Sequence, residues 1–140
     1  MDATIQPQCK APVFPNGQDT SVAPYSPGLR VGPWVFVSGQ GPLNFETMRF
    51  ETDRGIEHEA RLTLENVRSV LEAAGCKLTD VVKVTVYLQN MNDFVRFNEV
   101  YKQVFAEPWP ARTAVQAVLG AGISIEIDAI AIAGCGSDGA

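Results

Sequence analysis

Hydrophobic residues occur along the chain in short blocks, and five of these blocks have the spacing of β-strands. Residues 34–37 (WVFV) form a continuous apolar run bounded by glycine, proline and serine, and residues 29–31 are placed to pair with it. Apolar and polar side chains alternate over 82–88, while 111–118 begins directly after a proline and 123–133 is apolar at every odd position. These patterns predict strands that contribute one or both faces to a hydrophobic core.

Two other stretches repeat apolar residues at steps of three and four, which is the period of an α-helix. Residues 56–74 predict an amphipathic helix of about five turns, with Asp53 nearby as its N-cap and Gly75 just beyond its C-terminus. Residues 94–105 predict a second helix, which ends before the turn at 108–110.

The expected order of elements is strand, strand, helix, strand, helix, strand, strand. This order predicts an α+β fold in which two helices pack on one face of a mixed β-sheet. The glycine-containing segment 119–122 is interpreted as a hairpin that makes the last two strands neighbours. The other sheet face would carry a patch too apolar for a monomer, so we expect a homo-oligomer formed through the sheet. The residues expected on that face are Val81, Thr85, Tyr87, Ile130 and Ile132.

The first part of the chain lacks this periodicity. Residues 1–28 are rich in proline, glutamine, serine and aspartate, so they predict an extended surface segment rather than a helix. We therefore divide the chain into an extended N-terminal arm at 1–22 and a single domain at 23–140. The polar segment 44–53 is expected to be a turn with at most a short strand.

Composition narrows the class of protein. The 140 residues and 15.1 kDa correspond to one ordinary domain, and 46% hydrophobic with 19% charged residues is typical of a chain that buries a core. The net charge of −5 and the isoelectric point near 4.8 argue against a protein that binds nucleic acid through many phosphates. No apolar run approaches the roughly 20 residues of a transmembrane helix, and the N-terminus lacks a signal-peptide pattern, so we expect a cytoplasmic protein without a membrane partner.

Few residue types are available for catalysis. Cys9, Cys76 and Cys135 are far apart and form no CxxC pair, which predicts free thiols rather than a zinc or disulfide framework. His58, the only histidine, lies in a charged stretch and is interpreted as a surface residue. Because the chain has one histidine and no glycine-rich phosphate motif, neither a metal site nor a nucleotide cofactor is expected. Any chemistry must use carboxylates, arginine, tyrosine, backbone groups and water.

Two charged residues interrupt the apolar strands. Arg112 is interpreted either as an edge cation or half of a structural ion pair, or as a bidentate ligand for a substrate carboxylate. Glu126 lies in the last strand, with Asp128 two residues later on the same face, and is either a solvated charge or a carboxylate that accepts a proton from water. The expected hairpin would bring the side chains of Arg112 and Glu126 close together.

Three further positions are candidates for lining a site. Asn98 falls inside the apolar stripe of the second helix, where a buried amide must bond either to backbone or to groups of a site. The turn that begins at Ser38 and Gly39 either simply ends a strand or exposes backbone N–H groups to a ligand. Tyr25 lies in the extended segment, from which its ring can close over a neighbouring surface.

Taken together, seven segments resemble the YjgF-like family, also called the Rid family of reactive-intermediate deaminases. They are PYSPGLRVG, VFVSGQGPL, LENVRSVLEAAG, DVVKVTVYL, MNDFVRFNEVY, PARTAV and IEIDAIA, in the family's order from Pro24 to Ala133. The resemblance implies a fold like that of chorismate mutase and a homotrimer with a cleft between each pair of subunits. It also implies hydrolysis of 2-imino acids, and of their 2-enamino tautomers such as 2-aminoacrylate, to 2-keto acids and ammonia.

By the same resemblance, Arg112 matches the arginine that binds the substrate carboxylate, and Glu126 matches the glutamate that orients the attacking water. Tyr25 matches a tyrosine that reaches the cleft. The other matching residues that line the cleft are Ser38, Gly39 and Asn98. Ala114 stands where many members carry serine or cysteine, so only its backbone N–H is expected to serve. Gly41 stands where a bulkier residue is usual, which implies a roomier cleft.

Two alternatives remain open at this point. The enlarged cleft also fits a deaminase of a longer enamine with two carboxylates, such as 2-aminomuconate. Proteins that resemble this family have also been described as translation inhibitors, RNA-cleaving proteins or chaperone-like factors. The acidic isoelectric point and the absence of a Lys/Arg cluster make the RNA-directed role the less favoured one.

Overall fold

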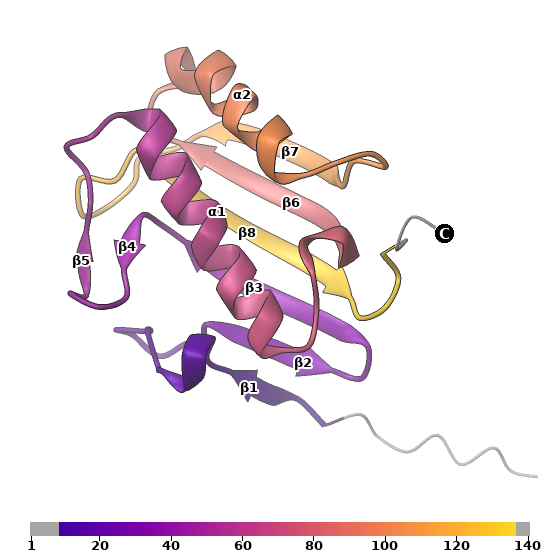
Figure 1. Cartoon of the computed structure of the whole chain (residues 1–140). Coiled ribbons are helices and arrows are strands. Elements are labelled where there is room, and N and C mark those ends of the chain that lie inside the picture. The colour runs from indigo at the N-terminus through magenta and orange to yellow at the C-terminus, as the bar shows by residue number, and fades with distance from the viewer. Residues whose placement is uncertain (1–8, 137–140) are drawn as a thin grey trace, which may run out of the picture.

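The computed structural model describes residues 9–136 and contains two α-helices on one face of a β-sheet (Figure 1). The helices are α1 (Ile56–Ala73) and α2 (Phe94–Val104). The strands of the main sheet are β1 (Ala11–Val13), β2 (Gly28–Val31), β3 (Trp34–Gln40), β6 (Val81–Leu88), β7 (Ala111–Gln116) and β8 (Ile125–Ile132). The smaller elements are the strands β4 (Leu43–Asn44) and β5 (Arg49–Phe50) and the 3₁₀ turns η1 (Pro15–Gly17), η2 (Leu78–Asp80) and η3 (Met91–Asp93).

The main sheet has the strand order β1-β2-β3-β8-β6-β7. Its neighbours are antiparallel except β6 and β7, which are parallel, so the sheet is mixed. A parallel pair needs a crossover connection, and α2 provides it between β6 and β7. The prediction of an α+β fold with two helices on one face of a mixed sheet is confirmed.

The predicted hairpin at residues 119–122 is wrong, because β7 and β8 are not neighbours. β6 lies between them and pairs with β7 along one edge and with β8 along the other. The segment does turn, since Ala121 and Gly122 have φ angles of 58° and 72°. However, the α2 crossover has already placed β7 beside β6, so the chain crosses the end of β6 before it returns as β8.

The hydrophobic core lies between the helices and the sheet. The alternation in β6 directs Val84, Val86 and Leu88 toward the helices with no exposed surface, and the odd positions of β8 do the same with Ile125 and Ile127. Both helices add fully buried residues, among them Leu64, Val67, Leu71 and Phe97. The alternation also determines which side chains point to the other face of the sheet.

Glycine residues mark both ends of α1. Gly75 follows the helix with a φ angle of +81°, as predicted for the C-terminal end. The N-cap is Gly55 and no side chain caps it, so the expected cap at Asp53 is wrong. Asp53 lies two residues before the N-cap position, from which a capping side chain must reach the first free N–H groups. Within residues 9–136, no helix combines the length and the hydrophobicity that a membrane span requires.

The face of the sheet turned away from the helices carries exposed aromatic residues. Trp34 and Phe36 of β3 are 44% and 41% exposed, and their ring centroids are 6.4 Å apart. Ile130 and Ile132 of β8 lie opposite Phe36 and Trp34 in the sheet register and are half-buried. These four residues form the apolar patch, which has the composition of a surface that a partner covers.

Val81 does not join the apolar patch, contrary to expectation. A register shift between Val81 and Lys83 places an extra residue in β6 relative to β8. Because side chains alternate between the faces of a strand, this bulge turns Val81 into the core, where it is 6% exposed. Thr85 and Tyr87 lie beyond the bulge and are half-buried on the face away from the helices, as predicted.

Part of the N-terminal segment belongs to the sheet. Ala11–Val13 form β1, which pairs antiparallel with β2, and Val13 packs into the core with 7% exposure. Residues 18–27, between η1 and β2, form neither helix nor strand and lead past Tyr25 to the sheet. Residues 1–8 of the expected arm lie outside the described residues.

Candidate functional site

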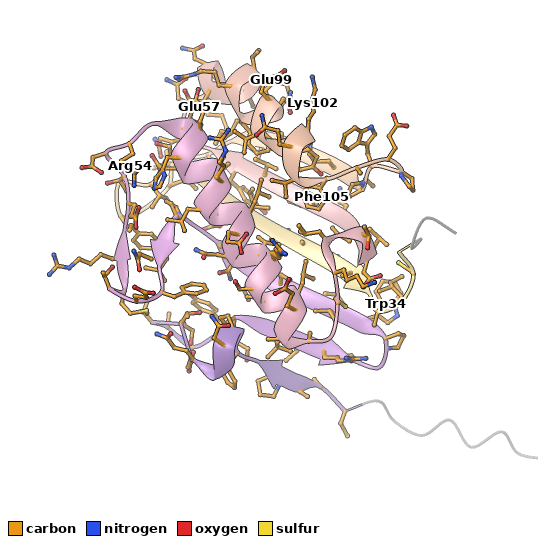
Figure 2. All side chains as sticks on the ribbon, in the orientation of Figure 1. Trp34, Arg54, Glu57, Glu99, Lys102 and Phe105 are labelled. Carbon is orange, nitrogen blue, oxygen red and sulfur yellow. The ribbon has the colours of Figure 1, made fainter. Side chains whose placement is uncertain are left out.

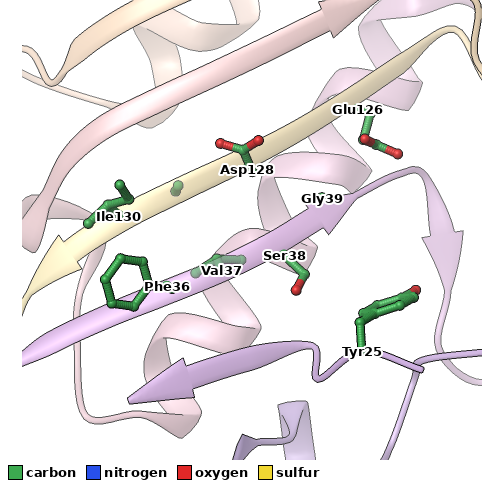
Figure 3. Close-up of a pocket in the computed structure, with 9 residues that line it drawn as sticks. Tyr25, Phe36, Val37, Ser38, Gly39, Glu126, Asp128 and Ile130 are labelled. Carbon is green, nitrogen blue, oxygen red and sulfur yellow. The ribbon is translucent and has the colours of Figure 1, made fainter. Parts of the chain in front are cut away.

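Four of the residues singled out from the sequence line one pocket. This pocket of about 570 Å³ lies where the middle of β3 meets β8 and the segment before β2. Its lining includes Tyr25, Ser38, Gly39 and Glu126, with Asp128 beside them. Figure 3 shows the β3 positions Ser38 and Gly39 between the Tyr25 ring on one side and the Glu126 carboxylate on the other. We call it the Glu126 pocket.

A bulge in β3 shapes the floor of the Glu126 pocket. Val37 lies opposite Ala129 and Gln40 lies opposite Ile127, so two residues of β3, Ser38 and Gly39, face a single residue of β8. A Cβ atom at position 39 would lie 2.7 Å from Oε2 of Glu126, which is closer than real Cβ contacts allow. Glycine at position 39 therefore leaves the space that the Glu126 carboxylate occupies.

Ser38 attaches the Tyr25 segment to this bulge. Its hydroxyl donates to the carbonyl oxygen of Ser26 at 2.6 Å, and its backbone N–H donates to the carbonyl oxygen of Pro27 at 3.0 Å. Tyr25 directly precedes this anchored stretch, and its side chain remains 47% exposed. The expected turn at Ser38 is wrong, because β3 continues through the bulge to Gln40. The hydrogen bonds of Ser38 fix the segment from which the Tyr25 ring extends.

Glu126 has the properties of a proton acceptor. Burial raises the pKa of its carboxyl above the ordinary value, and the neighbouring carboxylate of Asp128 raises it further. Asp128 accepts a hydrogen bond from the Tyr87 hydroxyl at 3.1 Å, and its negative charge raises the pKa of Tyr87. No lysine or arginine is among the described residues that line the pocket, so no cation there opposes these effects.

Arg112 lies in a different pocket, of about 450 Å³, between β7 and the C-terminal half of α2. We call it the Arg112 pocket. The Nη1 atom of Arg112 donates a hydrogen bond to Oδ1 of Asn98 at 2.8 Å. Of the two expectations for Asn98, the described residues support the second: its amide oxygen accepts a hydrogen bond from the charged residue of the candidate site. The other lining residues are Tyr101, Lys102, Trp109 and Pro110.

Three aromatic rings surround the guanidinium group of Arg112. Its central carbon lies 4.7 Å from the ring centroid of Tyr101 and 5.6 Å from those of Phe94 and Phe97. The apolar spacing of residues 94–105 predicted only that these rings belong to the core, so their contact with a cation was missed. Lys102, on the outer side of α2 (Figure 2), pairs with Glu99 at 3.1 Å rather than with any group of the site.

Arg112 and Glu126 lie on opposite faces of the sheet in one chain. Arg112 pairs in register with Val84, which is fully buried beneath the helices, whereas Glu126 pairs with Tyr87 on the other face. The expectation that a hairpin brings them together is therefore wrong. Ala114 lies two residues beyond Arg112 on the same face, half-buried against the core, and lines neither pocket.

The two pockets divide the chemistry between them. The Arg112 pocket offers a cation whose described polar partner is a neutral amide, so it can bind an anion. The Glu126 pocket offers a carboxyl with a raised pKa in a space that Tyr25 also lines, so it can exchange protons with a bound molecule. Among residues 9–136, no group of three or more His, Cys, Asp or Glu side chains is arranged to hold a metal ion.

Comparison with known protein families shows to which family this chain belongs. The sequence profile of the family described as Endoribonuclease L-PSP matches residues 17–133. The chain belongs to this family, which is also called the YjgF or Rid family of reactive intermediate deaminases. Both pockets lie inside the matched region.

Two relatives of this Rid-family chain are 42% and 44% identical to it over the aligned residues. A RutC family protein of Pyrococcus horikoshii is 44% identical over 124 residues, which is 87% of this chain and 97% of the relative. Human 2-iminobutanoate/2-iminopropanoate deaminase is 42% identical over 115 residues, which is 81% of this chain and 83% of the human protein. The name of the human relative is that of an imine deaminase.

Solved structures agree with the fold of this Rid-family chain. RidA from the Antarctic bacterium Psychrobacter matches with a TM-score of 0.82 at 36% identity, over 87% of this chain and 98% of that one. Escherichia coli TdcF with bound serine matches with a TM-score of 0.80 at 37% identity, over the same shares of the two chains. The mixed sheet and its two helices are thus the fold of the family.

Proposed function

We propose that this protein hydrolyses 2-imino acids and their 2-enamino tautomers, of the 2-aminoacrylate and 2-iminobutanoate type, to 2-keto acids and ammonia. The names of the relatives support this substrate class. The observation that carries the proposal is that the Arg112 guanidinium has no anionic partner among the described residues. Within the part of the chain that is described, this half-buried cation bonds to the neutral Asn98 amide and has no carboxylate within ion-pair distance. A substrate carboxylate supplies the anion that such a cation requires.

Glu126 is the residue that transfers protons in the proposed reaction. In the proposed reaction the substrate carboxylate lies on Arg112, and Glu126 holds a water molecule against the imine carbon. The oxygen of water bonds to that carbon while Glu126 takes one proton of the water and passes it to the imine nitrogen, which gives a neutral carbinolamine. Glu126 then takes the hydroxyl proton of the carbinolamine and passes it to the amino nitrogen, so the carbon–nitrogen bond breaks and ammonia leaves as the carbonyl forms. Tyr25, Ser38 and Gly39 line the space in which the reacting carbon lies.

A site that uses both the Arg112 pocket and the Glu126 pocket requires a second subunit. Because Arg112 and Glu126 lie on opposite faces of one sheet, no small imino acid can contact both in the same chain. We propose a homotrimer in which the Arg112 pocket of one subunit meets the Glu126 pocket of the next. The exposed apolar patch of Trp34, Phe36, Ile130 and Ile132 is the surface that such an assembly buries. Light scattering should give a mass near three times 15.1 kDa.

A coupled assay tests the proposed activity. A lyase generates 2-aminoacrylate or 2-iminobutanoate in the cuvette, and semicarbazide traps the imine that remains. Added protein should lower the rate of trapping and raise the rate of keto-acid release. An unchanged trapping rate at every enzyme concentration would remove the imine deaminase assignment. 2-Aminomuconate as a parallel substrate decides whether the longer diacid is preferred.

A further inference from the structure

Tyr101 is the described aromatic residue nearest to the guanidinium of Arg112. The central carbon of Arg112 lies 4.7 Å from its ring centroid, nearer than to Phe94 or Phe97 at 5.6 Å each. The three rings lie at the i, i+3 and i+7 positions of α2, so they share the face of the helix that meets β7. A cation within about 6 Å of a ring face is attracted by the electron density of that face.

The hydroxyl of Tyr101 makes no described hydrogen bond that would explain a tyrosine at this position. The side chain is 5% exposed, and its oxygen has no hydrogen-bond partner among the described residues. Burial raises the pKa of the phenol, and the nearby charge of Arg112 opposes this only in part. A buried hydroxyl without a partner destabilises a fold. The contact that serves Arg112 is therefore made by the ring.

We propose that Tyr101 is a positioning residue for Arg112, whose ring holds the guanidinium plane so that its free N–H groups point into the pocket. Two contacts are needed to orient a planar group. Asn98 fixes one nitrogen by a hydrogen bond of 2.8 Å, and the Tyr101 ring fixes the plane. Of the five N–H donors of an arginine, those not used by Asn98 are left for a bound carboxylate. This inference rests on the proposed function, in which that carboxylate belongs to the substrate.

Three substitutions separate the ring from the hydroxyl and from general packing. Tyr101→Leu should weaken pyruvate binding about tenfold and raise KM by a similar factor, with little change in kcat, because orientation of Arg112 governs binding. Tyr101→Phe keeps the ring and should restore the affinity while raising Tm. Phe105→Leu is the control for lost core volume. The ring centroid of Phe105 lies 4.7 Å from that of Tyr101, but Phe105 makes no described contact with Arg112, so affinity should stay unchanged.

Fluorinated rings provide a test that does not depend on folding of the leucine variant. Phenylalanine analogues with one, two or three ring fluorines at position 101 keep the size of the side chain but withdraw electron density from the ring face. Pyruvate affinity, measured by calorimetry, should fall stepwise with each fluorine while Tm stays nearly constant. A ring that served only as core packing would show no such trend.

Each outcome either supports or overturns the role of Tyr101. A loss in Tyr101→Phe as large as in Tyr101→Leu would mean that the hydroxyl makes the functional contact, and flat affinities across the fluorinated series would mean that the ring does not act on the cation. Both results overturn the inference, as does a wild-type protein that binds no pyruvate. Graded pyruvate binding by a protein that hydrolyses no imine would leave the inference standing and remove the proposed function.

Discussion

The Arg112 pocket and the Glu126 pocket belong to the same sheet but are built in different ways. Arg112 is held from the helix side by three aromatic rings and the Asn98 amide, so its position depends on how α2 packs on β7. Glu126 lies over a bulge on the other face, where Gly39 leaves space for its carboxylate. Large aromatic side chains form the Arg112 pocket, whereas the Glu126 pocket depends on the absence of a side chain at Gly39.

The electrostatic surroundings differ in the same way. The described groups in direct contact with the Arg112 guanidinium, the Asn98 amide and three aromatic rings, are neutral, so its charge is free to attract an anion. Burial and Asp128 raise the pKa of Glu126, which makes it a stronger base than an ordinary glutamate once it is ionised. In the proposed function, binding and proton transfer therefore belong to separate structural units. Substitutions in one pocket should therefore change affinity, and substitutions in the other should change rate.

The largest expected effect is that of Glu126→Gln on the chemical step. Glutamine is nearly isosteric but cannot accept the proton of water, so kcat for imine hydrolysis should fall about 10²- to 10⁴-fold. The dissociation constant of pyruvate should change little, because in the proposed function the keto-acid carboxylate binds to Arg112. Steady-state kinetics and calorimetry check the two halves of this expectation. Normal turnover by the variant would transfer water activation to Tyr25 or Asp128.

Arg112→Ala should have the next largest effect, and mainly on affinity. Removal of the cation from a partly desolvated site should weaken pyruvate binding by about 10²-fold or more. Arg112→Lys should recover only part of the loss, because lysine lacks the bidentate fork. Arg96→Ala is the matched control, since Arg96 lies on the same helix as Asn98 but pairs with Asp93 and Glu57 outside the pocket. Equal affinities for the wild type and Arg112→Ala would assign Arg112 to structure.

Gly39→Ala tests whether the absence of a side chain at position 39 positions the Glu126 carboxylate. The added Cβ must displace the carboxylate, which is 2.7 Å away, and a misplacement of this kind should lower kcat about tenfold or more while pyruvate still binds. Gly120→Ala is the control, because nothing lies within 4 Å of its added Cβ and its φ is not in the left-handed region. If both alanine variants retain full kcat, the bulge does not position Glu126.

The smallest expected effect is a shift in pH dependence. Activity should fall as the pH drops through the raised pKa of Glu126, because the protonated carboxyl cannot take a proton from water. Asp128→Asn removes the like charge that contributes to this raised pKa, so the acid limb of the kcat/KM profile should move to lower pH. The move should be partial, since burial is the larger cause. A shift in the opposite direction would contradict the electrostatic account of the pocket.

Local patterns predicted the elements well because each reflects burial of one face. The alternation in residues 82–88 and the steps of three and four in residues 56–74 correspond to β6 and α1 with small differences at the ends. Asn98 could be singled out because a polar residue in an apolar stripe needs a partner, and that partner is Arg112.

Pairing between strands was harder to predict. The glycine-containing turn at 119–122 looks the same whether the strands it joins are neighbours or flank a third, so the separation of Arg112 from Glu126 could not be derived from spacing. The bulge at Val81 likewise leaves no mark in the alternation of residues 82–88. The contact of Tyr101 with Arg112 was missed because an aromatic residue in an apolar stripe gives no sign of the cation it meets across the chain.

The proposed functional site combines Arg112 of one subunit with Glu126 of another, and subunit complementation tests this arrangement most directly. Arg112→Ala and Glu126→Gln chains, each almost inactive alone at substrate concentrations well below KM, are co-expressed with two different tags and purified through both. In a cyclic trimer of mixed composition, one cleft of the three contains both wild-type residues, so the mixture should show about one third of the wild-type activity. Activity no higher than that of the separate variants would contradict a site shared between subunits.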